Sequence, residues 1–518
     1  MEIPVNILRQ EEVAALKLRA LYQEAGFNLF CLKSFEEYNF YLENKNFLAD
    51  DDVIKFSAAD GRLLALNPDV TLSIVKNTAA HESRRLYYNE NIYRHNHHTN
   101  EYQQLNQAGI EIIGSVDKQA ELEVIQLAIA SLEVIGQAKL EFSHSGLVAA
   151  ILALFPCNRQ AEVFSSIKNK DSAALKDLAQ QVHLAPALTT NLCELLQLSG
   201  EINESLQTAL TLTKDLPHAH QALVELQELA TALLKEAVTP RLLFDLSTVN
   251  DTNYYSGIIF QGFVPQVPQA ILFGGRYDGL LQSLGKTQAA IGFGIHLNAI
   301  ATDTVTAKNE RTHLNIALPK GRMGEKVYHM FHEAGLCQEN LLDESRKLIF
   351  TDEENGLRFF LVKPSDVASY VEHGAADIGI VGRDILLETE ADVLDVLRFA
   401  IGQCDIAIAG AKNFQKDASR PLKVATKYPT IARKYFSSRS QPVELIYLNG
   451  SIELAPLVGL ADVIVDIVET GTTLKENGLE VFEKITDSSA HLVVNRTSWR
   501  FKQSEIYEII QKVGAKND

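Results

Sequence analysis

The sequence predicts a multidomain protein with an α+β N-terminal part and an α/β C-terminal part. Its 518 residues exceed what one hydrophobic core supports and suffice for about three domains. Residues 1–302 mix strand-like and helix-like segments, except for a helical insert at about 145–238. Residues 303–312 are polar and without periodicity, so we expect a linker there. In residues 313–518, short apolar strands alternate with helices, which predicts a doubly wound α/β fold in two lobes.

The composition is that of a globular protein with an acidic surface. Hydrophobic residues make up 46% and charged residues 22% of the chain, and the formal net charge at pH 7 is -18. This balance argues against nucleic acid and anionic membranes as partners. The N-terminal residues lack the apolar core of a signal peptide and no apolar run approaches a membrane span, so we expect a cytoplasmic protein. The five cysteines form no CxxC pair, which favours reduced thiols.

Periodic patterns predict the first elements of the N-terminal part. Residues 8–26 and 118–136 have apolar positions at helical spacing and end at a glycine, so each predicts an amphipathic helix. Residues 55–66 predict two strands around a tight turn. Residues 84–93 and 107–114 predict a strand pair that brackets a polar loop.

The polar loop, residues 95–103, contains three histidines, His95, His97 and His98, which raises the question of a metal site. No acidic or cysteine partner lies at ligand spacing, so a solvated loop explains these histidines better. Farther along, Leu, Ala, Glu and Gln dominate the insert at about 145–238, and this composition predicts several helices. Strand patterns return only after it.

Six motifs of the N-terminal part occur in a specific order. They are LNPDVT at 66–71, IYRHN and QAGIEIIG within 92–114, NYYSG at 253–257, FGGRYDGL at 273–280 and IGFGIHL at 291–297. Together they resemble the catalytic core of histidyl-tRNA synthetases. The resemblance implies a class II synthetase fold, an antiparallel sheet flanked by helices. It also implies a histidine pocket made of Asp69, Thr71, Gln107, Glu111, Tyr254 and Tyr255, with Arg276 nearby. Carboxylates suit the amine and the imidazole N–H of histidine, and tyrosines suit its ring.

The arginines of the synthetase pattern are largely missing. Arg94 is present, but residues 95–103 contain neither Arg nor Lys. The catalytic arginine falls on Asn250, the arginine of the last motif falls on Ala299, and no anticodon-binding domain follows residue 300. Because arginines hold the ATP phosphates during adenylation, we expect this part to bind histidine without activating it. It is similar to the synthetase-like regulatory subunit of ATP phosphoribosyltransferase, so we expect histidine to act from here as an inhibitor.

Two strand–turn–helix segments of the C-terminal part are candidate anion sites. A predicted strand at 314–318 leads into a glycine turn with Lys320 and Arg322 beside a helix start. The alternative is a surface turn with two solvated cations. Residues 462–480 contain an apolar strand, the turn ETGTT and a short helix, so unpaired backbone N–H groups and three hydroxyls converge on one place. An ordinary turn with a threonine N-cap is the alternative there.

Five motifs also mark the C-terminal part. They are ALPKGR at 317–322, SRKLIF at 345–350, DVASYVEHGAADIGIVGRD at 366–384, VATKY at 424–428 and NGSIELAPLVGLADVIVDIVETGTTL at 449–474. They resemble the catalytic ATP phosphoribosyltransferase of histidine biosynthesis. The resemblance implies two α/β lobes of the periplasmic-binding-protein type, with the active site between them. Because the chain ends soon after the ETGTT turn, we expect the short form of the enzyme, fused behind its regulatory subunit.

The resemblance implies that ATP reacts through adenine N1 with C1 of 5-phosphoribosyl 1-pyrophosphate, releasing pyrophosphate. N1 already carries a lone pair, so catalysis requires positioning and charge stabilisation more than a strong base. We expect Arg322 and Arg346 to neutralise the phosphates, Lys320 to assist, and Mg²⁺ to bind mainly through substrate oxygens and water. The implied 5-phosphate contacts are Glu469, Thr470, Gly471, Thr472, Thr473 and Leu474. Asp466 or Glu469 is expected to reach the ribose hydroxyls. Glu453 is a candidate for the ribose or Mg²⁺, and equally an ordinary helix-start carboxylate.

Two other functions are weighed against this one. A non-catalytic sensor of a small solute, with a periplasmic-type fold, needs no second polyphosphate site, so the basic turn and the ETGTT turn weigh against it. A translation enzyme acting on histidine tRNA is disfavoured by the missing arginines and by the acidic charge. From the synthetase resemblance we also expect a homo-oligomer.

Overall fold

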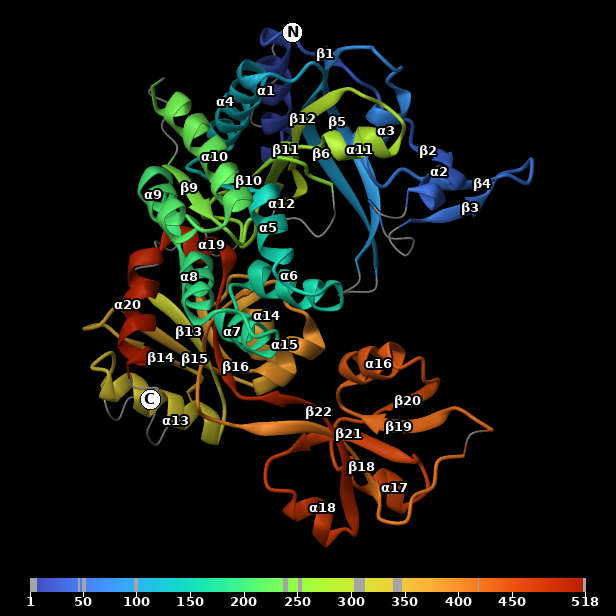
Figure 1. Cartoon of the computed structure of the whole chain (residues 1–518), viewed down its shortest axis with the longest axis vertical. Helices are drawn as coiled ribbons and strands as arrows, with labels where there is room; N and C mark the ends of the chain where they lie inside the picture. Colours follow the sequence, from blue (N-terminus) through green and yellow to red (C-terminus); the bar gives the residue numbers. More distant parts are fainter. Residues whose placement is uncertain are drawn as a thin grey trace. The chain divides into compact units, whose positions relative to one another are not determined.

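The computed structural model describes residues 7–44, 47–48, 53–96, 101–235, 241–249, 254–301, 313–338, 347–417 and 419–515. The chain folds as two compact units, Met1–Glu310 and Arg311–Asp518 (Figure 1). The linker predicted at 303–312 lies outside the described residues. Within the described ranges, no single helix is long and apolar enough to cross a membrane.

The first unit contains a nine-stranded sheet. Its strands are β1 (Asn28–Leu29), β5 (Arg84–Asn96), β6 (Glu101–Gly114), β7 (Lys139–His144), β8 (Ser199–Glu201), β9 (Arg241–Asp245), β10 (Ile258–Phe263), β11 (Leu272–Arg276) and β12 (Ala289–His296). They lie in the order β1-β5-β6-β12-β11-β10-β7-β9-β8. The five consecutive pairs from β5 to β7 are antiparallel, whereas β1 pairs with β5 and β9 pairs with β7 in parallel. The centre of the sheet is therefore antiparallel, as predicted.

Helices and one small sheet complete the first unit. The helices outside the insert are α1 (Gln10–Glu24), α2 (Tyr38–Glu43), α3 (Val70–Asn77), α4 (Lys118–Ile135), α11 (Asp278–Ser283) and α12 (Asn298–Ala301). The insert contains α5 (Ser145–Leu152), α6 (Gln160–Asn169), α7 (Ser172–Gln181), α8 (Pro186–Gln197), α9 (Ile202–Leu212) and α10 (Pro217–Lys235). The small sheet has the order β2-β4-β3, with β2 (Phe35–Glu37), β3 (Lys55–Ser57) and β4 (Leu63–Leu66). The two strands predicted at 55–66 are thus confirmed.

Two predictions for the first unit need correction. The polar loop expected at 95–103 is shorter, because His95 pairs with Tyr102 and Asn96 with Glu101 at the end of the β5–β6 ladder. His97 and His98 lie outside the described residues. The insert is not entirely helical, since β8 pairs with β9 at the edge of the large sheet. A strand of three residues is too short to produce a readable alternation.

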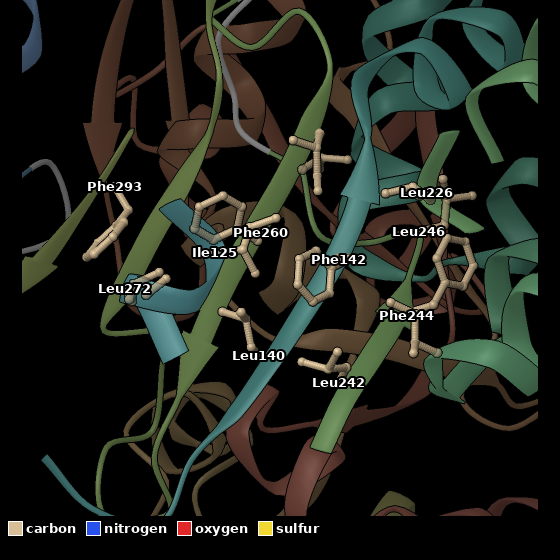
Figure 2. Packing of buried hydrophobic residues seen from close by; sticks show 14 of the residues in the cluster. Ile125, Leu140, Phe142, Leu226, Leu242, Phe244, Leu246, Phe260, Leu272 and Phe293 are labelled. Carbon is tan, nitrogen blue, oxygen red and sulfur yellow. The ribbon is translucent and has the colours of Figure 1, made fainter. Parts of the chain in front are cut away.

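The core of the first unit lies against the middle of the large sheet. Phe142 on β7 is in register with Phe260 on β10 and with Phe244 on β9, so the three rings share one face (Figure 2). All three side chains are fully buried. Ile125 of α4 and Leu226 of α10 belong to the same cluster. The other face carries a separate cluster of buried side chains, and the candidate pocket described below lies on that face.

The second unit contains two sheets. The six-stranded sheet has the order β14-β15-β13-β16-β23-β17 and the five-stranded sheet the order β20-β19-β21-β18-β22. The strands of the first are β13 (Leu314–Pro319), β14 (Ile349–Asp352), β15 (Leu357–Val362), β16 (Ile378–Gly382), β17 (Leu394–Arg398) and β23 (Ala490–Val494). Those of the second are β18 (Cys404–Ala411), β19 (Leu422–Thr426), β20 (Val443–Tyr447), β21 (Val463–Val468) and β22 (Leu479–Ser488). The helices are α13 (Arg322–Glu333), α14 (Val367–Glu372), α15 (Arg383–Thr389), α16 (Pro429–Ser438), α17 (Leu454–Leu457), α18 (Thr472–Glu476), α19 (Arg496–Phe501) and α20 (Gln503–Gly514).

Both sheets of the second unit are mixed, which corrects the doubly wound prediction. β13 is parallel to β15 and β16, but β23 is antiparallel to β16 and β17. In the other sheet β19 is parallel to β20 and β21, but β18 is antiparallel to β21 and β22. The chain passes between the sheets twice, once after β17 and once between β22 and β23. Antiparallel β18 and β23 directly follow these two crossings, whereas β14 is antiparallel to β15 through a hairpin.

Candidate functional site

Four glycines on three neighbouring strands of the first unit form a surface without side chains. Gly294 on β12 is in register with Gly109 on β6, and Gly292 on β12 is in register with Gly275 on β11. Residues in register share a face, and so do residues two apart on one strand. The four glycines therefore lie together on the same face of the sheet, and we call them the glycine floor.

Each glycine of the floor leaves room for the end of a pocket side chain. A Cβ at Gly292 would lie 1.7 Å from Glu111 Oε2, and one at Gly294 would lie 2.0 Å from Gln107 Nε2. A Cβ at Gly275 would lie 2.6 Å from the Tyr255 ring. Such short approaches are impossible, so any other residue would displace these side chains. Because the floor carries no side chains, the polar ends of Glu111 and Gln107 can lie directly against the sheet. A ligand bound there could reach them.

Glu111 lies at the centre of the pocket. Its side chain is buried, with only 2% of the residue exposed. Thr71 Oγ1 donates to Oε1 over 2.7 Å, and the Tyr277 hydroxyl donates to Oε2 over 2.6 Å. Burial raises the pKa of the Glu111 carboxyl to about 8, although the two hydroxyl bonds oppose this shift. The structure therefore brings together Glu111 and Thr71, two residues predicted for the histidine pocket.

Asp69 and the tyrosine pair lie near Glu111, since Asp69 and Tyr254 both interact electrostatically with its carboxyl. Asp69 caps α3, since its Oδ1 accepts from Leu72 N over 2.8 Å. Its Oδ2 accepts from Arg94 Nη2 over 2.9 Å. The ring of Tyr254 lies 5.2 Å from that of Tyr255 and 5.6 Å from that of Tyr277, measured between centroids. A carboxylate beside an aromatic wall suits a ligand that carries both an amine and a ring.

Arg276, expected near the pocket, is held by two carboxylates, and two further residues of the site were not predicted. The Arg276 guanidinium pairs with Glu121 over 2.7 Å and with Asp278 over 2.8 Å, not with Glu111. Tyr277 is the residue that contacts Glu111, and it lies inside the FGGRYDGL motif. Tyr88 also faces the floor, because it is in register with Gly109. Strand alternation in β5 could have identified it. Asn250 lies outside the described residues.

The second unit contains the segment 469–473, which we call the threonine loop. It follows β21, and Gly471 adopts the left-handed conformation with a φ of 69° just before α18. This conformation explains the need for glycine. Thr470 and Thr472 share a hydrogen bond of 3.0 Å between their hydroxyls, and both are exposed, as are Glu469 and Thr473. Leu474 is buried and anchors the helix start. The predicted strand, turn and helix are all present.

Two carboxylates lie near the threonine loop. Asp466 is half-buried on β21, and its Oδ1 accepts from Ile467 N over 2.8 Å. Burial raises the pKa of the Asp466 carboxyl to about 6, and the negative charge of Glu453 adds to this shift. Asp466 and Glu453, predicted separately, are therefore close enough for their charges to interact.

The six-stranded sheet carries the basic turn, Lys320 to Arg322, at the carboxyl end of β13. Both side chains are exposed, and neither has a hydrogen-bond or ion-pair partner in the part of the chain that the structure describes. Lys363 follows the parallel strand β15 and Arg383 follows β16, so further cations lie at the same edge of the sheet. Arg346 lies outside the described residues.

Comparison with known proteins separates the chain into two regions of similarity. The family described as Histidyl-tRNA synthetase matches residues 4–300, and the family described as ATP phosphoribosyltransferase matches residues 363–515. An ATP phosphoribosyltransferase of Brachyspira hyodysenteriae is 51% identical over 201 residues, which are 39% of this chain and 98% of that protein. An ATP phosphoribosyltransferase of Clostridioides difficile is 52% identical over 202 residues, which are 38% of this chain and 96% of that protein.

One solved structure is similar in fold to much of the chain. It is described as an ATP phosphoribosyltransferase regulatory subunit/histidyl-tRNA synthetase from Bacillus halodurans. The similarity covers 63% of this chain and 86% of that chain, with 23% sequence identity and a TM-score of 0.52. At this level of identity the likeness concerns the fold alone.

The raised pKa of Glu111 predicts a pH-dependent stability of the first unit. Between the ordinary pKa of 4.5 and the folded value of about 8, the folded state holds a proton that the unfolded state has lost. The free energy of unfolding should therefore fall as pH rises through this window, by at most about 1.4 kcal/mol per pH unit. Glu111→Gln should remove this slope, whereas Glu133→Gln, at an exposed position on α4, should keep it. Chemical denaturation at several pH values measures the free energy of unfolding of the wild type and of both variants. Equal slopes in the wild type and Glu111→Gln would contradict the assignment of the raised pKa to Glu111.

Proposed function

The chain belongs to the ATP phosphoribosyltransferase family through its second unit and to the histidyl-tRNA synthetase family through its first, and we propose that the first regulates the second. The second unit is a pentosyltransferase: it joins ATP to 5-phosphoribosyl 1-pyrophosphate, giving 1-(5-phosphoribosyl)-ATP and pyrophosphate in the first step of histidine biosynthesis. The observation that carries this conclusion is identity of about half over nearly the whole length of curated relatives.

We propose that the substrates bind between two lobes of the second unit, each built on one of its sheets. The two crossings between mixed sheets support a periplasmic-binding-protein-like arrangement. The threonine loop would hold the ribose 5-phosphate, because its hydroxyls are exposed and its backbone turn is fixed by Gly471. Asp466 or Glu469 would accept hydrogen bonds from the ribose hydroxyls. The basic turn, with Arg346, would neutralise the other phosphates.

Magnesium fits this site as a partner of the substrates. Mg²⁺ retains several waters and binds through one or two carboxylates together with substrate phosphates. Burial and the nearby charge of Glu453 raise the pKa of the Asp466 carboxyl, and a bound cation would offset this cost of ionising Asp466. When bound, Mg²⁺ would neutralise charge on the pyrophosphate as it leaves. Lys320 and Arg322 would contribute positive charge from the protein, fixed at a helix start before the reaction begins.

We propose that histidine binds on the glycine floor of the first unit and inhibits the second. Glu111 and Asp69 would contact the ring and the amine, and Tyr254 would cover the ring. Arg94 is already bonded to Asp69 and to the carbonyl of Pro68, so it is held within the amino-acid pocket. The residue at the end of the last motif is Ala299, which cannot hold a phosphate. Binding without adenylation therefore fits these residues better than aminoacylation does.

A solute sensor without catalysis, the alternative weighed from the sequence, fits the second unit less well. It would require only one ligand to fit the cleft, and it would release no pyrophosphate. Exposed cations at the carboxyl ends of the parallel strands β13 and β15 favour a polyphosphate substrate over a neutral solute. A steady-state assay of pyrophosphate release separates the two functions.

Arg322 provides the test of the catalytic proposal. Arg322→Ala should lower kcat by about 100-fold, because it removes a fixed charge from the developing pyrophosphate. The melting temperature should stay at the wild-type value, since the side chain is exposed. Lys326→Ala, one turn farther along α13 and also exposed, should keep wild-type kinetics. Wild-type kcat in Arg322→Ala would remove this residue from the mechanism.

Histidine inhibition tests the regulatory proposal. Pyrophosphate release from ATP and 5-phosphoribosyl 1-pyrophosphate is measured with and without histidine. We expect histidine to inhibit the wild type. In Tyr255→Ala the rates with and without histidine should be nearly equal, because the Tyr255 ring lies over the glycine floor. Tyr102→Ala, whose side chain is exposed on β6, should remain inhibited. A wild-type enzyme insensitive to histidine, or a Tyr255→Ala variant with full inhibition, would contradict the proposal.

A further inference from the structure

We infer that the hydroxyl of Tyr88 is a specificity-determining contact for the imidazole ring of histidine bound in the first unit. The inference rests on the proposed function, because it takes histidine as the ligand. Tyr88 has only 1% of its surface exposed. Its hydroxyl has no hydrogen-bond partner in the part of the chain that the structure describes. A buried hydroxyl without a partner is costly, and such groups call for a reason.

The position of this hydroxyl indicates what its partner is. A Cβ at Gly109 would lie 2.7 Å from it, and a Cβ at Gly294 would lie 3.0 Å from it. The hydroxyl thus ends above the glycine floor, on the face that Glu111 occupies. The adjacent tyrosine, Tyr87, points into the opposite cluster, where its hydroxyl accepts from Gln23 Nε2 over 2.9 Å. Of the two neighbours, only the one that faces the pocket lacks a partner.

The hydroxyl also stays protonated and can donate. Burial, together with the charges of Glu111 and Asp69, raises the pKa of the Tyr88 hydroxyl well above its ordinary value. Both oxygens of Glu111 already accept hydroxyl protons, from Thr71 and Tyr277. Glu111 therefore does not need Tyr88, and the Tyr88 proton is left for a ligand atom.

A neutral imidazole matches these two groups. It carries one N–H donor and one bare nitrogen that accepts. The carbonyl oxygen of Glu111 keeps a further lone pair for the N–H even when the carboxyl is protonated, and Tyr88 can donate to the bare nitrogen. A phenyl ring offers neither group, so it would leave the Tyr88 hydroxyl unpaired. A site with a buried polar group discriminates strongly against a ligand that cannot pair it.

The test compares Tyr88→Phe with Tyr87→Phe in the full chain. The two changes remove the same atom from adjacent residues of β5, one facing the pocket and one facing the core. Histidine binding is measured by titration calorimetry. We expect the dissociation constant to rise about ten-fold in Tyr88→Phe, and to stay within about two-fold of wild type in Tyr87→Phe.

A thermal melt without ligand supplies the second measurement. Tyr88→Phe should melt at or above the wild-type temperature, because its hydroxyl has no partner to lose. Tyr87→Phe should melt lower, because it loses the bond from Gln23. Two results would overturn the inference: wild-type affinity for histidine in Tyr88→Phe, or a melting temperature of Tyr88→Phe as low as that of Tyr87→Phe. If the wild type itself bound no histidine, the proposed regulatory function would fail, and this inference with it.

Discussion

The missing side chains of Gly109, Gly275, Gly292 and Gly294 are the constraint on which the first unit's pocket depends. A Cβ at any of them would meet a neighbouring atom at 2.1 Å or less, or 2.5 Å at Gly275, so the sheet cannot accept a larger residue without moving. The floor lets Glu111, Gln107 and Tyr255 extend along the sheet instead of standing away from it. The carboxyl of Glu111 is buried there, which accounts for its raised pKa.

The candidate sites of the two units carry opposite charge. In the first, Asp69 and Glu111 face a pocket with tyrosine walls, and this suits a small cationic or N–H-bearing ligand. In the second, the threonine loop and the basic turn lie at the ends of strands, where backbone N–H groups and cations suit phosphates. The acidic net charge of the chain therefore coexists with local positive charge at the carboxyl ends of β13 and β15.

Sequence patterns predicted most elements because apolar periodicity and glycine turns are local signals. They predicted the strand, turn and helix of the threonine loop, and they selected Asp69, Thr71 and Glu111, which the fold brings together. They did not predict β22, which is rich in charged residues and lacks regular apolar alternation. They also did not predict the mixed sheets, because strand direction depends on where the chain crosses between sheets. The pairing of Arg276 with Glu121 and the register of Tyr88 with Gly109 likewise depend on contacts between residues distant in the sequence.

The central claim is that the synthetase-like unit of this enzyme holds histidine on its glycine floor. A crystal structure of the full chain grown with histidine tests it most directly. The account predicts density for one imidazole ring above Gly292 and Gly294, within hydrogen-bond distance of Glu111. Histidine bound only in the second unit, or an empty floor at saturating histidine, would contradict it.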